Sequence, residues 1–313
     1  MAESLANFRS VFGSEEMARW YAGMLGRIEV PYEDMTITTH FGATHLLAAG
    51  PHDAPPVILL HGMEGTAISW RHQLNALAAD YRLYALDIIG SAGKSAPVRL
   101  PHVGDNYTEW LADVLDGLGL RQASFVGMSN GCWLIIKFAA YAPGAITRAA
   151  LLSASGLTPV RFPYTMARLL ERKSVDALLG KIVAPVVTRN LVRRSVTLAA
   201  PKGLPIDGDE MEWNYLLAKH YRYRFPPPPL TGEQLRRLTA PTLLLMGERE
   251  QFFLPRATLA HARAHLPNLR IAEVVAGVGH NMATDDPATI NGYIRAFLPA
   301  RAESEALHQR DGA

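Results

Sequence analysis

The stretch Gly127-Met128-Ser129-Asn130-Gly131 has the pattern G-x-S-x-G, and it determines how we interpret the rest of the chain. Residues 123–126 before it are mostly apolar and suit a β-strand, whereas residues 132–140 after it suit a buried helix. A serine between such a strand and helix takes a strained backbone conformation at the tip of a tight turn. Glycine on either side removes the collisions that larger residues would cause there. The pattern therefore predicts a serine hydroxyl presented at the end of a sheet.

Length and composition indicate a soluble globular protein. The chain has 313 residues, of which 49% are hydrophobic and 19% charged, and its formal net charge is +2. So small a charge gives no reason to expect a nucleic acid or membrane partner. One cysteine excludes an internal disulfide and a cysteine-rich metal site. Residues 1–10 lack a basic start followed by an apolar run, so we expect no signal peptide and a cytoplasmic location.

Strands and helices alternate along most of the chain, which predicts a mostly parallel sheet flanked by helices. We expect strands at 35–40, 44–48, 57–60, 82–86, 123–126, 149–152, 242–246 and 270–275. We expect helices at 14–25, 69–79, 107–118, 132–140, 256–266 and 287–297. The first two strands flank Gly42 and are interpreted as a hairpin.

The alternation stops after the strand at 149–152, and only helical patterns follow, at 164–172, 175–198 and 210–221. We interpret this stretch as an all-helical insertion. The predicted organisation is an α/β core of residues 1–156 and 238–300, with an N-terminal helical extension at 1–30, a helical cap at 157–237 and a tail at 301–313. The aromatic residues Trp213, Tyr215, Tyr221 and Tyr223 are expected to pack the cap onto the body more than to line a pocket.

A serine hydroxyl needs a base to remove its proton before it can act as a nucleophile. Among 11 histidines, His280 is the best candidate, because it lies in a glycine-containing loop directly after the expected strand at 270–275. An acid must then orient the imidazole, and acidic residues follow the strand at 242–246, one crossover before His280. Parallel strands end at one edge of a sheet, so Ser129, the acid and His280 should meet there.

Two glutamates compete for the role of the acid. Glu248 comes straight off the strand, in a position open to solvent, whereas Glu250 lies deeper in the loop, before Phe252-Phe253. Partial burial suits a carboxylate that holds a histidine, so we predict Glu250 and keep Glu248 as the alternative. Asp285 and Asp286 are nearer to the histidine in sequence, but Asp286-Pro287 has the pattern of a helix N-cap.

Acyl transfer also needs backbone N–H groups that stabilise an oxyanion. We expect one from Asn130, at the start of the helix after the serine, and one from Met63, in the loop after the strand at 57–60. His61 in that loop is expected to be structural. Such chemistry requires no metal and no cofactor.

A second glycine-containing motif, Gly90-Ser91-Ala92-Gly93-Lys94-Ser95, is similar to a phosphate-binding loop. The first glycine of G-x-x-x-x-G-K-[ST] would fall at Ile88, where it is missing, and Pro97 and Pro101 prevent a helix after Ser95. We therefore reject nucleotide binding.

The order Ser129, Glu250, His280, with His61-Gly62 upstream and a helical insertion after the sixth strand, resembles the α/β-hydrolase superfamily. The resemblance covers about residues 35–297. Asp87-Ile88-Ile89-Gly90 and Gly247-Glu248-Arg249-Glu250 look like bacterial carboxylesterases of the naproxen-esterase type. That branch has glutamate as the acid of its triad, which supports Glu250, although many other relatives have aspartate there and a shorter glycine-rich loop after Asp87. Epoxide hydrolases and dehalogenases of similar layout use an aspartate nucleophile, against which Ser129 argues.

These features together predict a serine carboxylic-ester hydrolase that forms an acyl-enzyme on small to medium-sized apolar esters. One alternative on the same fold is a hydrolase of carbon–carbon bonds, a lyase, or a cofactor-free oxygenase or cyclase, because one fold supports many reactions. The other alternative is a non-catalytic binder of a small ligand. Neither the natural ester nor the oligomeric state follows from the sequence.

Overall fold

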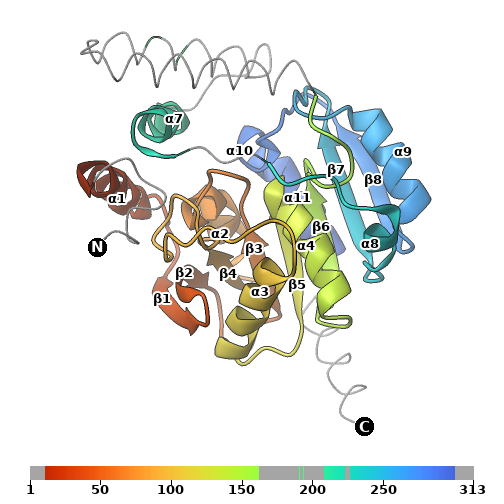
Figure 1. The fold of residues 1–313 in the computed structure, drawn as a ribbon, viewed down its shortest axis with the longest axis horizontal. Coiled ribbons are helices and arrows are strands. Elements are labelled where there is room, and N and C mark those ends of the chain that lie inside the picture. Colours follow the sequence, from red (N-terminus) through yellow and green to blue (C-terminus); the bar gives the residue numbers. More distant parts are fainter. Residues whose placement is uncertain (1–10, 162–189, 191–192, 194–207, 223–225, 300–313) are drawn as a thin grey trace.

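The computed structural model describes residues 11–161, 190, 193, 208–222 and 226–299 (Figure 1). The helix predicted at 164–172, most of the one predicted at 175–198, the tail at 301–313 and Tyr223 lie outside the described residues, as does most of the predicted cap.

An eight-stranded sheet forms the centre of the molecule, with the strand order β1-β2-β4-β3-β5-β6-β7-β8. Strands β1 and β2 form the predicted hairpin, and β2 is antiparallel to both of its neighbours. Every pair from β4 to β8 is parallel, which confirms the predicted mostly parallel sheet. The strands are β1 Tyr32–Thr39, β2 Gly42–Ala49, β3 Pro56–Leu60, β4 Arg82–Leu86, β5 Ala123–Met128, β6 Ile146–Leu152, β7 Thr242–Gly247 and β8 Leu269–Val275.

Helices cover both faces of this sheet (Figure 1). The α-helices of the described residues are α1 Val11–Leu25, α2 Arg71–Leu77, α3 Asn106–Gly117, α4 Asn130–Tyr141, α7 Gly208–His220, α8 Gly232–Arg236, α9 Pro255–His265, α10 Met282–Asp285 and α11 Pro287–Phe297, and η2 Ala67–Trp70 is a 3₁₀-helix. Side chains of α3, α4, α8 and α9 pack on one face, and those of α2, α10 and α11 pack on the other.

The continuous apolar run of strand β3 fits a sheet that is covered by helices on both faces. Alternate residues of a strand point to opposite sides, so Ile58 and Leu60 pack with α3 and α4 while Val57 and Leu59 pack with α2 and α11. All four side chains are almost completely buried. Burying an aliphatic side chain of this size contributes roughly 1.5–3 kcal/mol, which makes the central strands a rigid base for the loops at their ends.

Two local predictions differ from the structure. The first helix already includes Val11, three residues before its predicted start at residue 14, and Gly13 lies close against the ring of His220 in α7. The helix predicted at 69–79 is a 3₁₀ turn, η2, followed by α2. The backbone N–H of Ala67 donates to Asp87 Oδ1 at 2.7 Å, and this long-range contact fixes where the turn begins.

Helix α7 confirms the helix predicted at 210–221 and lies beside α1 (Figure 1). Trp213, Tyr215 and Tyr221 are buried in a small cluster with Met17 of α1, as their predicted packing role requires. Within the described part of the chain, no helix is both long and apolar enough to cross a bilayer.

Candidate active site

Ser129 occupies the turn between β5 and α4 that the sequence predicts. Its φ of 50° and ψ of −110° put it in the left-handed region, which a serine adopts only when its surroundings fix it. A Cβ atom at Gly131 would lie 2.0 Å from the Leu60 carbonyl oxygen, and one at Gly127 would lie 2.6 Å from Ile135 Cδ1. Both glycines are therefore required for the close packing of the turn. The serine itself is half-buried.

His280 and Glu250 are in direct contact. Nδ1 of His280 donates to Glu250 Oε2 at 2.8 Å, while Glu250 Oε1 accepts the backbone N–H of Phe252, also at 2.8 Å. The carboxylate side chain is fully buried, and 12% of the imidazole is exposed. Among the described residues Nε2 of His280 has no hydrogen-bond partner, so the second ring nitrogen remains available to a substrate or to Ser129.

The charge state of Glu250 follows from these contacts. Burial by itself would raise the pKa of the carboxyl, but the adjacent His280 and the N–H of Phe252 outweigh burial and hold the pKa below its usual value. Glu250 is therefore a carboxylate at neutral pH. A buried carboxylate on Nδ1 keeps the proton on that nitrogen and leaves Nε2 as the basic atom.

The ring of Phe252 supports the imidazole from its face. The two ring centres lie 4.2 Å apart with an interplanar angle of 38°, and Phe253 lies within 6.0 Å of the same ring. His280 is thus held by a carboxylate at its edge and by an aromatic side chain on its face. Both supports come from the loop after β7.

The other three acids make different contacts. Glu248 is exposed, and its Oε2 accepts the N–H of Gly277 at 2.9 Å. Asp285 accepts the N–H of Gly279 at 2.7 Å, and burial raises the pKa of its carboxyl. Asp286 caps α11 by accepting the N–H of Thr289, which confirms its predicted role. Of the two competing glutamates, only Glu250 contacts the histidine.

The loops that carry these side chains adjoin one another at the carboxyl ends of the parallel strands. Three backbone hydrogen bonds join them in series: Ser129 N to Leu152 O at the end of β6, Ser153 N to Leu245 O near the end of β7, and Glu248 N to Val275 O at the end of β8. Ser129 Oγ and His280 Nε2 make no hydrogen bond to each other within the described part of the chain. A proton transfer between the two would require a closer approach, and catalytic hydrogen bonds are often long in unliganded enzymes.

The loop after β3 passes directly beside the serine. A Cβ atom at Gly62 would lie 3.4 Å from Ser129 Cβ, so the following residue, Met63, lies close to the serine. Asn130 is the first residue of α4, and the N–H of a first helical residue has no partner inside its own helix. Both predicted oxyanion donors thus belong to segments that adjoin Ser129.

His61 holds this loop in place. Its Nδ1 donates to Gly62 O at 2.7 Å, and its Nε2 accepts the N–H of Ile88 at 3.0 Å. Both ring nitrogens are occupied, and complete burial lowers the pKa of the imidazole. His61 is therefore a neutral structural residue, as predicted. No cluster of three or more His, Cys, Asp or Glu suited to a metal ion occurs in the part of the chain that the structure describes.

Comparison with known proteins shows the family of this chain. Residues 55–287 match the family described as alpha/beta hydrolase fold. The chain belongs to the α/β-hydrolase family. It is 31% identical over 268 residues to the Bacillus subtilis protein named uncharacterized carboxylesterase nap, an alignment that covers 84% of this chain and 86% of that one. Carboxylesterase YbfK of the same organism is 28% identical over 303 residues, covering 95% of this chain and 98% of the other.

The crystal structure of naproxen esterase from Bacillus subtilis has the same fold, with a TM-score of 0.79 and 27% sequence identity over 91% of this α/β-hydrolase and 98% of the esterase. These comparisons confirm the predicted family, the predicted fold and the resemblance to carboxylesterases of the naproxen-esterase type. They also bear out the predicted enzyme class, a carboxylesterase-type hydrolase.

Proposed function

We propose that this α/β-hydrolase cleaves carboxylic esters through an acyl-enzyme on Ser129, with His280 and Glu250 completing a catalytic triad. The observation that carries the proposal is the 2.8 Å contact between His280 Nδ1 and the fully buried Glu250 carboxylate, beside a serine held in a strained turn. That contact leaves one basic ring nitrogen, which is the requirement for activating a serine.

In the first half of the reaction, Ser129 Oγ attacks the ester carbonyl carbon while His280 Nε2 takes the hydroxyl proton. The carbonyl oxygen becomes an oxyanion and accepts hydrogen bonds from the N–H groups of Met63 and Asn130. The tetrahedral intermediate then breaks its bond to the alcohol oxygen, and His280 returns the proton to that oxygen. Glu250 stabilises the imidazolium that exists between the two proton transfers.

In the second half, water replaces the alcohol. His280 Nε2 removes a proton from the water as its oxygen attacks the acyl carbon, and the same two N–H groups hold the second oxyanion. Collapse of this intermediate releases the carboxylic acid, and the proton on His280 returns to Ser129 Oγ. Every proton is carried by the protein or by water, so the sequence of steps needs no further group.

The relatives named carboxylesterase and naproxen esterase support small-molecule esters as the substrate class. We propose small to medium-sized apolar esters, with residues 157–237 acting as the cap that shapes the substrate cavity. The proposal includes no nucleic acid or membrane partner, and a cytoplasmic location remains a prediction from the sequence.

The test is turnover of p-nitrophenyl esters of graded chain length by the wild type and by Ser129→Ala. We expect the variant to lose roughly 10³-fold or more in kcat. Its circular dichroism spectrum and urea midpoint should stay those of the wild type, because the hydroxyl is half-buried and packs no core. Mass spectrometry of acid-quenched wild type should show one acyl group per chain. Unchanged turnover in Ser129→Ala would overturn the proposal.

A further inference from the structure

Helix α7 contacts two loops of the active site at once. Nε1 of Trp213 donates to the carbonyl oxygen of Glu64 at 2.9 Å, in the loop that holds Met63. Oε1 of Glu210 accepts Nδ2 of Asn281 at 2.5 Å, in the loop that holds His280. Residues 210 and 213 are three apart, so they lie on one face of the helix. A single helical face therefore bridges two loops. One is the loop after β3 that holds Met63, here called the oxyanion loop, and the other is the loop after β8 that holds His280.

We propose that Glu210 and Trp213 are positioning residues that set the distance between the oxyanion donor and His280. The inference rests on the proposed esterase function and goes beyond it, because neither side chain takes part in bond making or proton transfer. Instead, the two residues join loops that leave β3 and β8, which lie at well-separated positions in the strand order of the sheet.

The hydrogen bond from Trp213 to Glu64 restrains a residue of the oxyanion loop that has an unfavourable backbone conformation. Gly65 N donates to Gly62 O at 3.0 Å and closes a four-residue turn with Met63 and Glu64 at its centre. Glu64 has a φ of 64°, a conformation that turns of this kind usually give to glycine or asparagine. A glutamate stays in it only when the surroundings hold it. The indole N–H of Trp213 is one such restraint, two peptide units away from the Met63 N–H.

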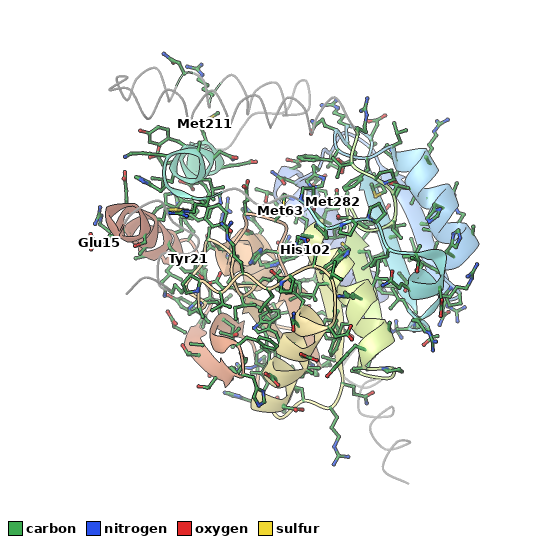
Figure 2. All side chains as sticks on the ribbon, in the orientation of Figure 1. Glu15, Tyr21, Met63, His102, Met211 and Met282 are labelled. Carbon is green, nitrogen blue, oxygen red and sulfur yellow. The ribbon has the colours of Figure 1, made fainter. Side chains whose placement is uncertain are left out.

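The contact at Asn281 fixes the chain directly after the base. The carbonyl oxygen of Asn281 accepts the N–H of Thr284 at 2.8 Å, and Asn281 is the N-cap residue of α10. Its side-chain amide is held by Glu210, and its neighbour His280 is held by Glu250. Figure 2 labels a residue next to each of the two contacts, Met63 before Glu64 and Met282 after Asn281.

Helix α7 can act as a fixed support because α1 anchors it. The rings of Trp213 and Trp20 stack with their centres 4.4 Å apart. Lys219 and His220 both contact Glu16, at 2.9 Å and 2.6 Å. The N-terminal helix α1 therefore holds in place the helix that aligns the catalytic loops.

The experiment compares Trp213→Phe and Glu210→Ala with the wild type. Phenylalanine keeps an aromatic ring against Trp20 but removes the N–H. We expect kcat to fall roughly 10- to 100-fold in each variant, because small misplacements of catalytic groups cost about that much. KM should change less than about threefold, since these contacts are not to substrate. Affinity for a boronic acid, whose tetrahedral adduct needs the oxyanion site, should fall in proportion to kcat/KM.

Two further variants serve as controls. Glu210→Gln keeps the oxygen that accepts the Asn281 amide and should restore kcat to within about threefold of the wild type. Asp209→Asn removes a charge from the same helix at a residue that faces Arg27, 3.4 Å away, and should leave kcat unchanged. The urea midpoint of each variant separates misalignment from unfolding.

Wild-type kcat and boronate affinity in both Trp213→Phe and Glu210→Ala would overturn the inference, and so would a loss of kcat that Glu210→Gln fails to restore. The proposed function fails separately, through absent ester turnover in the wild type. Reaction of Ser129 with a fluorophosphonate in every variant shows that the nucleophile itself is intact, so the two failures are distinguishable.

Discussion

Two histidines of this protein each contact a fully buried carboxylate, and they differ at the other ring nitrogen. His280 contacts Glu250 through Nδ1, and among the described residues its Nε2 has no partner. His45 contacts Asp87 through Nδ1 at 2.7 Å, and its Nε2 contacts Asp34 at 2.9 Å. The first ring is bound on one side only, whereas the second is bound on both sides. A histidine and a buried acid are therefore not sufficient for catalysis; the second nitrogen must be accessible.

The surroundings of Asp87 explain why the second pair is structural. Its carboxylate also accepts the N–H groups of Ala67 at 2.7 Å and Lys94 at 2.9 Å. Burial alone would raise the pKa of this carboxyl, but His45 and the two N–H groups hold it below its usual value. Asp87 thus anchors β4, β2, η2 and the loop at residues 90–95 to one another.

The same anchor explains the motif that is similar to a phosphate-binding loop. A Cβ atom at Gly93 would lie 2.2 Å from Asp87 Cγ, so only glycine lets the chain pass so close. Ser95 Oγ donates to the Asp87 carbonyl oxygen at 2.5 Å, and Lys94 Nζ contacts Asp34 at 2.7 Å. The glycine, lysine and serine of the motif bind protein acids and backbone in place of a phosphate.

Removing His280, the proposed base, gives the largest expected effect. His280→Ala should lower kcat by roughly 10³- to 10⁶-fold, because the serine loses its base. The free energy of unfolding should fall as well, because Glu250 then stays buried without its main partner. Steady-state kinetics and urea unfolding measure the two quantities. If His280→Ala kept more than a tenth of the wild-type kcat, His280 would not be the base, and the contrast between His280 and His45 would have no bearing on activity.

Neutralising Glu250, the proposed acid, should have the next largest effect. Glu250→Gln keeps the shape of the side chain but removes the charge that stabilises the imidazolium, so kcat should fall roughly 10²- to 10⁴-fold. Glu248→Gln is the matched control at an exposed glutamate of the same loop and should stay within about twofold of the wild type. The opposite ranking of the two variants would move the acid to Glu248.

Breaking the structural pair should reduce stability more than activity. His45→Ala leaves Asp87 buried without its main partner, which costs about 3–5 kcal/mol of unfolding free energy. His40→Ala is the control, because His40 makes an exposed pair with Asp113 at 2.9 Å and such pairs contribute about 0–1 kcal/mol. Urea unfolding at neutral pH gives both values. Equal losses in the two variants would show that the buried network does not stabilise the fold.

The smallest effect is one of pH. The pKa of Asp87 is lower in the folded than in the unfolded chain, so the stability it contributes is complete above its unfolded pKa, about 3.9, and is lost as pH falls through the folded pKa. The difference in unfolding free energy between wild type and Asp87→Asn should therefore be constant from pH 7 to about pH 5 and shrink below about pH 4. If the difference in unfolding free energy grew as the pH fell, the pKa of Asp87 would be higher in the folded chain than in the unfolded chain, contrary to this prediction.

Pattern and strand order were enough to predict the sheet, its central strands and the edge of the sheet at which Ser129, Glu250 and His280 lie. Buried parallel strands have short apolar runs, and their carboxyl ends bring residues 129, 250 and 280 to one edge whatever the loops do. Burial of the loop before Phe252 was enough to favour Glu250 over Glu248. In each case a local pattern and one rule of topology carry the inference.

Contacts between distant segments were not predictable in this way. The bond from Trp213 to Glu64 joins residues 149 positions apart, and that from Asn281 to Glu210 joins residues 71 apart. Neither residue pair has a local signal, and Glu64 occupies a position where a glycine would have marked the turn. The bridge of α7 across the active site is therefore visible only in the folded chain.

Mass spectrometry after reaction with a fluorophosphonate tests the central claim most directly, with peptide mapping of the wild type, Ser129→Ala and His280→Ala. The account predicts one adduct per wild-type chain, on Ser129, no adduct in Ser129→Ala, and labelling of His280→Ala slowed by about the same factor as its ester turnover. An unlabelled wild type, or an adduct on another serine that survives in Ser129→Ala, would contradict the assignment of Ser129 as the nucleophile.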